Sequence, residues 1–153
     1  MKEIRGNIFS KSFLGMFRVI NITTNGFVKK NGSGVMGAGV AKQAREKFKG
    51  IESDLGNAVK QNGNVCQIIK TIQNINGTIW ILAFPTKHNW WEKSNLELIE
   101  KSTKELVALT DKMQWNKVVL PRPGCNNGQR KWLSEVKPIL KKYLDDRFYV
   151  ITL

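Results

Sequence analysis

The chain has 153 residues, 41% of them hydrophobic, and its 25 Lys and Arg outnumber its 12 Asp and Glu to give a formal net charge of +13. This composition suits one compact domain, and since no run approaches the ~20 apolar residues of a membrane span and the N-terminus lacks a signal peptide's hydrophobic block, we expect a cytoplasmic protein without a membrane role. Two Cys and one His are too few for a metal cluster or a disulfide framework, so we expect chemistry without a metal or another cofactor.

The hydrophobic pattern alternates between short strand-like runs and longer helical runs. It predicts, in chain order, a strand over 16–24, a loop over 25–37, helices over 38–48 and 52–61, strands over 65–71 and 78–84, a helix from 94 to 113, a strand over 117–120, a loop over 121–128, a helix through 136–144 and a last strand over 148–153. Such alternation predicts an α/β fold with helices on both faces of a mixed sheet.

Three local signals sharpen these predictions. Asn76-Gly77, between two predicted strands, is a typical hairpin turn and indicates one antiparallel pair. Ser94 and Glu97 form a capping-box pattern that opens the long helix. Pro138 fits only the first turn of the last helix, because proline has no backbone N–H to donate.

Residues 31–41 combine several glycines with a position between a predicted strand and a predicted helix. Positions without a side chain let a ligand approach the backbone, and the unpaired N–H groups at a helix N-terminus attract phosphate. The loop therefore predicts a diphosphate site. Gly32, Gly34 and Gly37 also match a dinucleotide fingerprint, but no acidic residue ends a strand about twenty positions on. A glycine loop that only turns the chain is a further alternative.

Four sequence blocks, spread over nearly the whole chain, resemble the macrodomain family. They are residues 4–8 (IRGNI), 35–41 (VMGAGVA), 84–87 (FPTK) and 120–128 (LPRPGCNNG), with Trp132 after the last. The resemblance is greatest to the branch of the terminal ADP-ribose protein glycohydrolase and the DNA ADP-ribosyl glycohydrolase antitoxin. It implies one three-layer α/β/α macrodomain over residues 1–153, with a mixed central sheet of about six strands. We expect a monomer.

The resemblance also implies an ADP-ribose site, with Asn7 and Ile8 by the adenine, residues 35–40 along the diphosphate and residues 124–128 over the distal ribose. The expected ligand contacts are Asn7, Ile8, Thr24, Gly34, Val35, Met36, Gly37, Ala38, Gly39, Val40, Pro121, Gly124, Cys125, Asn126, Asn127 and Gly128. Two positions depart from the family. Many macrodomains have an aspartate where Asn7 stands, and the protein glycohydrolase has a catalytic aspartate where this chain has Gly128.

Cleavage of an ADP-ribosyl bond develops positive charge at the anomeric carbon, so it needs a fixed ribose and a group that assists attack or departure. Lys87 is our candidate, because partial desolvation beyond an apolar strand favours a neutral amine that acts as base or nucleophile. The alternative is a surface lysine that only binds phosphate. Asn25 resembles the asparagine that contacts the ribose in hydrolytic branches; the alternative is a turn residue.

Other side chains near these loops suggest further roles. His88 and Cys125 resemble a nucleophilic pair, but Cys125 lies where the loop needs small residues and His88 is expected at the rim. Trp90 and Trp91 beside Lys93 suit stacking of a base of single-stranded DNA, or alternatively a hydrophobic cover over the long helix.

We therefore predict a hydrolase that removes ADP-ribosyl groups from DNA or protein. DNA is preferred because of the positive charge, which favours polyanions, and because of Gly128 in place of the aspartate. A solvated basic surface is the alternative explanation of the charge. Two other functions stay open, dephosphorylation of ADP-ribose 1''-phosphate and non-catalytic reading or sequestering of ADP-ribose or a related nucleotide signal.

Overall fold

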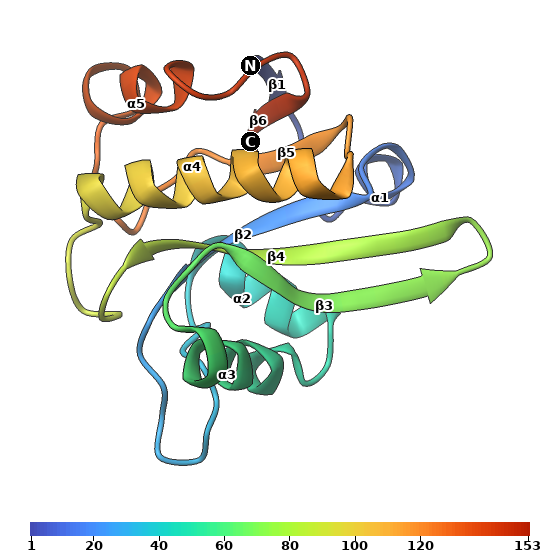
Figure 1. Ribbon diagram of the computed structural model, residues 1–153. Coiled ribbons are helices and arrows are strands. Elements are labelled where there is room, and N and C mark those ends of the chain that lie inside the picture. Colours follow the sequence, from blue (N-terminus) through green and yellow to red (C-terminus); the bar gives the residue numbers. More distant parts are fainter.

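A six-stranded sheet in the order β1-β6-β5-β2-β4-β3 forms the centre of the computed structural model, which describes residues 1–153 (Figure 1). The strands are β1 (Lys2–Arg5), β2 (Val19–Asn25), β3 (Gln67–Asn74), β4 (Gly77–Lys87), β5 (Val118–Pro121) and β6 (Phe148–Thr152). All neighbouring strands are parallel except β3 and β4, which form an antiparallel hairpin. The sheet is therefore mixed, with one antiparallel pair, as the sequence predicted.

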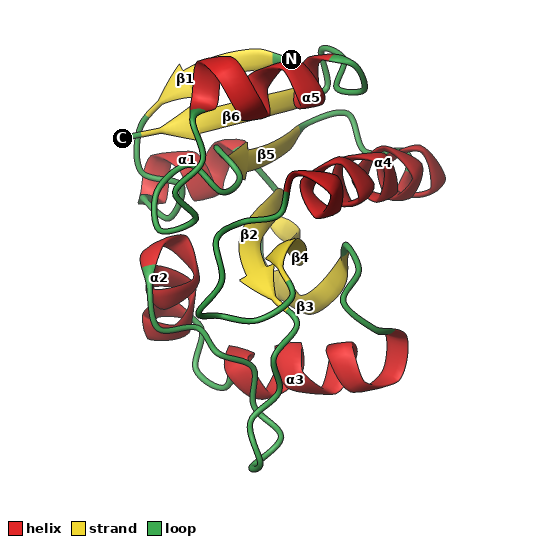
Figure 2. Ribbon diagram, turned by 90° about the vertical axis from the view of Figure 1, so that its left-hand side faces the viewer, coloured by secondary structure: helices red, strands yellow, loops and turns green.

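Helices cover both faces of the sheet (Figure 2). One face carries α1 (Lys11–Met16), α2 (Gly39–Lys47) and α3 (Ile51–Asn62), and the other carries α4 (Leu96–Met113), a π-helical turn (Trp132–Val136) and α5 (Lys137–Lys141). Each face has its own core: Ile20 and Ile22 of β2 lie in one and Val19 lies in the other. The expected three-layer α/β/α fold is confirmed. None of the helices has the length and apolar character that a bilayer span requires.

The N-terminal third contains two elements that the sequence pattern did not predict, β1 (Lys2–Arg5) and α1 (Lys11–Met16). The predicted strand over 16–24 begins only at Val19, because residues 11–16 form the short helix α1. Ser10 caps α1, and its hydroxyl oxygen accepts a hydrogen bond from Phe13 N at 3.3 Å. A serine that caps a single short turn gives little periodic pattern, so the helix was missed.

Two predicted helix boundaries are also wrong. The cap of α4 is Asn95, whose side chain accepts from Leu98 N at 2.9 Å, so Ser94 is not the capping residue. The predicted helix over 136–144 is a π-helical turn that leads into the five-residue α5. Pro138 does lie in the first turn of α5, where its missing N–H is tolerated.

Parallel pairing brings the carboxyl ends of five strands to one edge of the sheet. Arg5, Asn25, Lys87, Pro121 and Thr152 are the last residues of β1, β2, β4, β5 and β6. The loop between β2 and α2 leaves from the same edge and projects away from the sheet in Figure 1. In open α/β folds this edge is where ligands bind, since the loops there can diverge to form a crevice.

Candidate functional site

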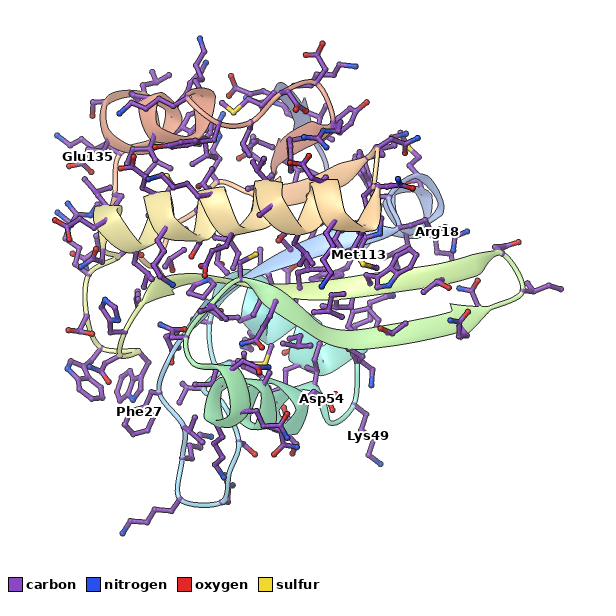
Figure 3. The ribbon with its side chains drawn as sticks, viewed as in Figure 1. Arg18, Phe27, Lys49, Asp54, Met113 and Glu135 are labelled. Carbon is purple, nitrogen blue, oxygen red and sulfur yellow. The ribbon has the colours of Figure 1, made fainter.

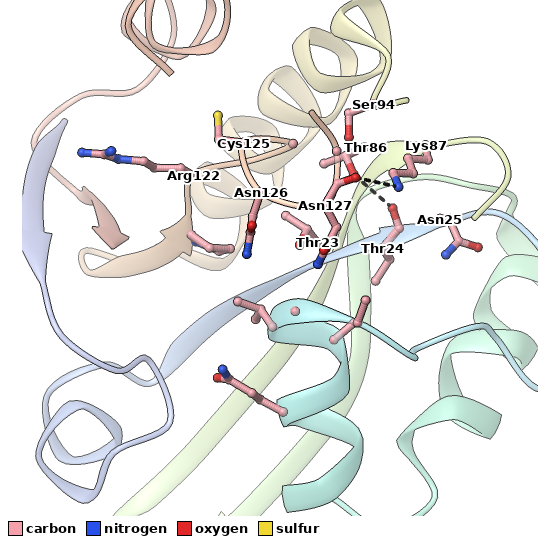
Figure 4. A pocket seen from close by; sticks show the side chains of 18 of the residues that line it. Thr23, Thr24, Asn25, Thr86, Lys87, Ser94, Arg122, Cys125, Asn126 and Asn127 are labelled. Carbon is pink, nitrogen blue, oxygen red and sulfur yellow. Dashed lines mark hydrogen bonds between the residues drawn. The ribbon is translucent and has the colours of Figure 1, made fainter. Parts of the chain in front are cut away.

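A cleft of about 900 Å³ lies at the carboxyl edge of the sheet (Figure 4). Its volume lies in the range of sites that bind nucleotide-sized ligands. We call its two extremes the β1–β6 end, which includes Asn7, Trp132 and Thr152, and the β4 end, which includes Thr24 and Lys87. The N-terminus of α2 lies between them, together with the loop that follows β5.

The cleft brings together most of the residues that the sequence assigned to a site. They are Asn7, Ile8, Thr24, Asn25, Val35, Gly37, Ala38, Gly39, Val40, Lys87, Pro121, Gly124, Cys125, Asn126, Asn127 and Gly128. Met36 and Gly34 are not part of the lining. Met36 is buried in the core with 2% of its surface exposed, while Gly34 packs against Leu55 and donates to Glu52 O at 2.8 Å. These two residues support the loop from beneath and do not line the cleft, and their predicted contact with the ligand stays a prediction.

The N-terminus of α2 is built to receive an anion. Ala38 is the cap residue and has no side chain that could accept from the first turn, so no side chain of the protein caps α2. The first turn of a helix has unpaired N–H groups and a partial positive charge, which together favour phosphate. Gly37 next to it has no heavy atom within 4 Å of where a Cβ would lie. The packing of the protein therefore does not require a glycine at this position. A ligand that lies against the backbone would require one, because a side chain would occupy its space.

The opposite wall is the loop over 124–128, which packs tightly on Ser94. A methyl group added at Gly128 would lie 2.0 Å from Ser94 Oγ, and Gly124 has a φ of 72°, a left-handed conformation that glycine adopts readily. Ser94 N donates to Gly128 O at 3.0 Å, and Arg130 donates to the carbonyls of Ser94 (2.6 Å, from Nε) and Gly124 (2.8 Å, from N). The two glycines are thus required by the packing of the wall.

The two walls approach each other at Asn127. A Cβ added at Gly39, the first residue of α2, would lie 3.0 Å from Asn127 Nδ2. The exposed asparagine amide therefore reaches across the cleft above the start of the helix. A diphosphate bound at α2 would lie beneath this donor.

Lys87 is the last residue of β4, whereas the sequence placed it just beyond the strand. Its Nζ donates to Trp90 O at 3.4 Å and to Asn127 O at 3.5 Å, so the amine bridges two loops at the β4 end (Figure 4). The register between β2 and β4 shifts here, since Thr24 pairs with Pro85 but Asn25 pairs with Lys87. Such a bulge re-aims side chains, and as a result both Thr86 and Lys87 line the cleft.

Asn25 lines the cleft but its polar atoms already have protein partners. Nδ2 donates to Val35 O at 3.2 Å, and Oδ1 accepts from Phe27 N at 3.1 Å. The side chain thereby connects the end of β2 to the glycine-rich loop that precedes α2. These contacts are those of a turn residue, the alternative that the sequence left open.

Cys125 and His88 do not form a nucleophilic pair. Cys125 lines the cleft, and its thiol donates to Pro123 O at 3.3 Å, while His88 is exposed and lies outside the lining. Burial raises the pKa of the Cys125 thiol to about 11. An activated thiolate needs the opposite shift, so this cysteine is not suited to nucleophilic attack.

The β1–β6 end contains residues that the sequence reasoning did not assign to the site. The Arg122 guanidinium lies 4.9 Å from the centroid of the Trp132 ring, and both side chains line the cleft. Trp132 Nε1 donates to Glu3 Oε1 at 3.0 Å, and Lys137 Nζ lies 2.6 Å from the same carboxylate. Lys137, then Trp132, hold the pKa of Glu3 below its usual range, against the opposing effect of desolvation.

The signals for these missed residues differ. Arg122 lies inside the block that carried the resemblance, between Pro121 and Gly124, so its position was an available signal. Phe27 and Lys29, from the loop after β2, also line the cleft. Nothing in the local pattern marks a loop residue as facing a cleft when the facing wall is distant in sequence.

Comparison with known proteins agrees with this architecture. No protein-family model matches the chain. The DNA ADP-ribosyl glycohydrolase of Thermus aquaticus is 28% identical over 149 residues, which cover 95% of this chain and 38% of that protein. The DNA ADP-ribosyl transferase-DNA ADP-ribosyl glycohydrolase fusion protein of Thermosipho africanus is 25% identical, over 76% of this chain and 34% of its own length. The chain therefore spans little more than a third of these relatives.

Solved structures give the same result. Thermosipho africanus DarTG in complex with ADP-ribose has a TM-score of 0.75 at 22% identity, over 98% of this chain and 41% of that chain. The macrodomain of Thermus aquaticus DarG has a TM-score of 0.74 at 26% identity, over 99% and 97% of the two chains. Sheet order, layers and cleft thus define a protein of macrodomain fold. Within that class the chain is similar to the macrodomains of DarG proteins.

Proposed function

We propose that this macrodomain binds ADP-ribose in the cleft and hydrolyses the bond between the distal ribose and a macromolecule, with DNA as the preferred substrate. The observation that carries the proposal is that one cleft contains both an uncapped helix N-terminus at α2 and the amine of Lys87. The first suits the diphosphate, and the second lies at the end where the distal ribose would be linked to its carrier.

The residues at the two ends of the cleft support this orientation of the ligand. The β1–β6 end offers the flat Trp132 ring and Ile8 to an adenine, and no free cation or helix terminus that would attract phosphate more strongly than α2. With the diphosphate at α2, the distal ribose extends toward Thr24 and Lys87. A related protein, Thermosipho africanus DarTG, has been solved in complex with ADP-ribose, which supports the same ligand here.

The proposed reaction is a hydrolysis at the anomeric carbon. Water supplies the hydroxyl that replaces the carrier, the bond to the carrier atom breaks with its electron pair, and that atom takes up a proton. Lys87 has an amine at this end of the cleft that contacts two loops, through Trp90 O and Asn127 O. We assign to it the assistance of attack or departure, as base or nucleophile.

Two observations favour DNA over protein as the carrier. The net charge of +13 attracts a polyanion, because phosphates release counterions when they meet Lys and Arg. Gly128 stands in the wall where the protein-directed branch has an aspartate, and its backbone packs on Ser94 so closely that no side chain fits. The curated relatives are DNA ADP-ribosyl glycohydrolases by name, which supports the same preference.

A substrate panel tests the proposal. Calorimetry with ADP-ribose should give binding, and incubation with an ADP-ribosylated DNA oligonucleotide should release ADP-ribose faster than incubation with an ADP-ribosylated protein. Release of phosphate from ADP-ribose 1''-phosphate alone would replace the glycohydrolase proposal with a phosphatase. Binding without turnover of any of the three would leave a reader of ADP-ribose, and absence of binding would refute the proposal altogether.

A further inference from the structure

Three aromatic side chains form one continuous exposed surface beside the β4 end of the cleft. Trp90 and Trp91 are 51% and 59% exposed, and their ring centroids lie 5.5 Å apart at an interplanar angle of 90°. Phe27, from the loop after β2, lies 5.6 Å from Trp91 at 70° (Figure 3). We call these three residues the aromatic surface. The rings pack on one another and stay half exposed, which contradicts their interpretation as a cover over the long helix.

The aromatic surface is continuous with the cleft. Phe27 and Trp90 line the cleft, and the carbonyl oxygen of Trp90 accepts from Lys87 Nζ at 3.4 Å. Trp91 lies one residue further out and is not part of the lining. A group attached to the distal ribose at Lys87 would therefore leave the cleft directly over exposed aromatic rings.

The residues around the aromatic surface are mainly cationic. Lys29 and Lys30 are exposed on the loop beside Phe27, and Lys93 is exposed two residues after Trp91. Two acidic residues lie nearby: Glu92, whose carboxylate accepts from Asn89 N at 2.6 Å, and Glu135, whose pKa is lowered by the hydrogen bond from Lys131 N and in part by the charge of Lys93. Two backbone bonds, Lys29 N to Ser33 O at 2.8 Å and Gly32 N to Lys29 O at 2.9 Å, close the loop and hold the backbone that carries the two lysines.

We propose that the aromatic surface stacks the bases of single-stranded nucleic acid next to the ADP-ribosyl linkage, while Lys29, Lys30 and Lys93 contact the flanking phosphates. The inference rests on the proposed function for the location of the linkage. Aromatic rings with nearby cations are the combination that binds single strands, since every base offers a π face and every nucleotide a phosphate. Paired bases in a duplex do not expose their faces, so a single strand is favoured.

The same observations weigh against other occupants. A second copy of this chain would bring its own lysines and a further net charge of +13 to the patch, which opposes self-association. A peptide carrier would bury the rings equally well, but it provides no regular anions for three lysines. A nucleic acid strand satisfies both the rings and the cations.

Binding of an unmodified single strand tests the surface independently of catalysis. Anisotropy of a labelled single-stranded DNA oligonucleotide should show that Trp91→Ala weakens binding about tenfold, whereas Trp91→Phe keeps most of the affinity because the ring is retained. ADP-ribose affinity by calorimetry should be equal in wild type and both variants, since Trp91 does not line the cleft. Equal oligonucleotide affinity in wild type and Trp91→Ala would overturn the inference.

Charge reversal tests the cations with a matched control. Lys29→Glu with Lys30→Glu should weaken the oligonucleotide complex and flatten its salt dependence, because phosphate contacts are lost. Lys47→Glu with Lys49→Glu makes the same charge change at exposed positions, and Lys49 lies far from Phe27 in Figure 3. If both pairs weaken binding equally, only net charge matters and the proposed surface is wrong.

Further measurements identify the kind of nucleic acid that binds, and they test this inference separately from the proposed function. A duplex of the same sequence should bind more weakly than the single strand, and an RNA strand of the same sequence shows which sugar is preferred. If Trp91→Ala slows turnover of ADP-ribosylated protein as much as that of ADP-ribosylated DNA, the surface serves a peptide and the inference fails. Loss of ADP-ribose binding in the wild type would refute the proposed function but leave the oligonucleotide result interpretable.

Discussion

The two ends of the cleft differ in how their polar groups are satisfied. At the β1–β6 end, Glu3 accepts from Trp132 Nε1 and pairs with Lys137 and Arg122, so the charged groups around the aromatic ring balance one another. Five buried side-chain polar atoms in the protein have no hydrogen-bond partner, and three of them belong to Thr24, Asn64 and Ser94 near the β4 end. The β4 end therefore retains buried polar atoms without a partner in the protein.

The difference between the two ends suggests that one binds the ligand and that the other is where the proposed reaction takes place. A buried polar atom without a partner costs about 1–3 kcal/mol, so proteins retain such atoms where they serve a purpose. A self-paired end suits a part of the ligand that is bound but not cleaved, such as the adenine. The unpaired polar atoms lie near Lys87, since Asn64 Nδ2 donates to Lys87 O at 3.0 Å while its Oδ1 has no partner. The bond cleavage that we propose at Lys87 therefore lies at the end with unpaired polar atoms.

The largest effect should come from Lys87→Ala. If this amine assists bond cleavage, kcat on ADP-ribosylated DNA should fall by about 100-fold or more, the usual contribution of a positioned acid or base. ADP-ribose affinity should change little, because the diphosphate site at α2 is separate. Single-turnover kinetics together with calorimetry measure the two quantities.

Lys87→Arg is the control for charge. Arginine keeps a cation that can donate to Trp90 O and Asn127 O but cannot act as base or nucleophile. If Lys87→Arg turns over substrate as fast as the wild type does, Lys87 supplies only charge. Lower ADP-ribose affinity in Lys87→Ala would instead identify a phosphate-binding lysine.

The second largest effect is expected from alanine substitutions at Gly128 and Gly37, which lie on opposite walls of the cleft. At Gly128 a methyl group would lie 2.0 Å from Ser94 Oγ and 2.6 Å from Gly124 O, so Gly128→Ala should destabilise the protein by about 1–3 kcal/mol and weaken ADP-ribose binding. At Gly37 the space is open, so Gly37→Ala should leave the melting temperature unchanged and weaken only the binding of ADP-ribose. Melting curves with and without ligand measure both.

A result at Gly37 decides what the glycine loop is for. If Gly37→Ala binds ADP-ribose as the wild type does, the loop only turns the chain, and the phosphate site must be sought elsewhere. The pair of variants therefore tests the alternative that the sequence could not exclude.

The sequence predicted the helices, strands and loops that form the cleft better than the directions of the side chains that line it. The strand, glycine loop and helix around α2 follow from local pattern, because hydrophobic period, glycine spacing and helix composition are local properties. Lys87 was predicted from the family resemblance and from its place after an apolar strand, and neither signal gives the direction of its side chain. The bulge that aims it depends on the pairing of β2 with β4, which are separated by more than 50 residues, and no local signal encodes that register.

The errors have equally specific causes. Ser94 and Asn95 are both good capping residues, and packing under the loop over 124–128 buries Ser94 and leaves the cap to Asn95. The aromatic surface joins Phe27 to Trp91 from loops that meet only because β2 and β4 are neighbours. Side chains brought together by tertiary structure cannot be paired from sequence spacing.

A smaller effect is expected for Thr24→Val, which removes an unpaired buried hydroxyl while keeping the shape of the side chain. Stability should rise by about 1 kcal/mol, because no protein hydrogen bond is lost. ADP-ribose binding should weaken by about fivefold if the hydroxyl pairs with the ligand. Thr110→Val is the matched control, since Thr110 Oγ1 donates to Leu106 O at 2.7 Å, and this variant should be less stable than the wild type. A loss of stability in both variants would show that Thr24 has a partner in solution.

The smallest effect is expected from alkylation of Cys125. Burial raises its pKa to about 11, so the thiol stays protonated as long as the pH is well below that value, and at pH 8 only about one molecule in a thousand carries the reactive thiolate. Iodoacetamide at pH 7 to 8 should therefore modify Cys125 barely at all, and the rate of modification should rise with each pH step toward 10.

Burial also raises the pKa of Cys66, which lies in the core outside the cleft. Peptide mapping by mass spectrometry separates the two cysteines, and ADP-ribose should slow only the reaction at Cys125, because only that residue lines the cleft. Fast labelling of Cys125 at neutral pH would mean that the β4 end is not the only reactive part of the cleft.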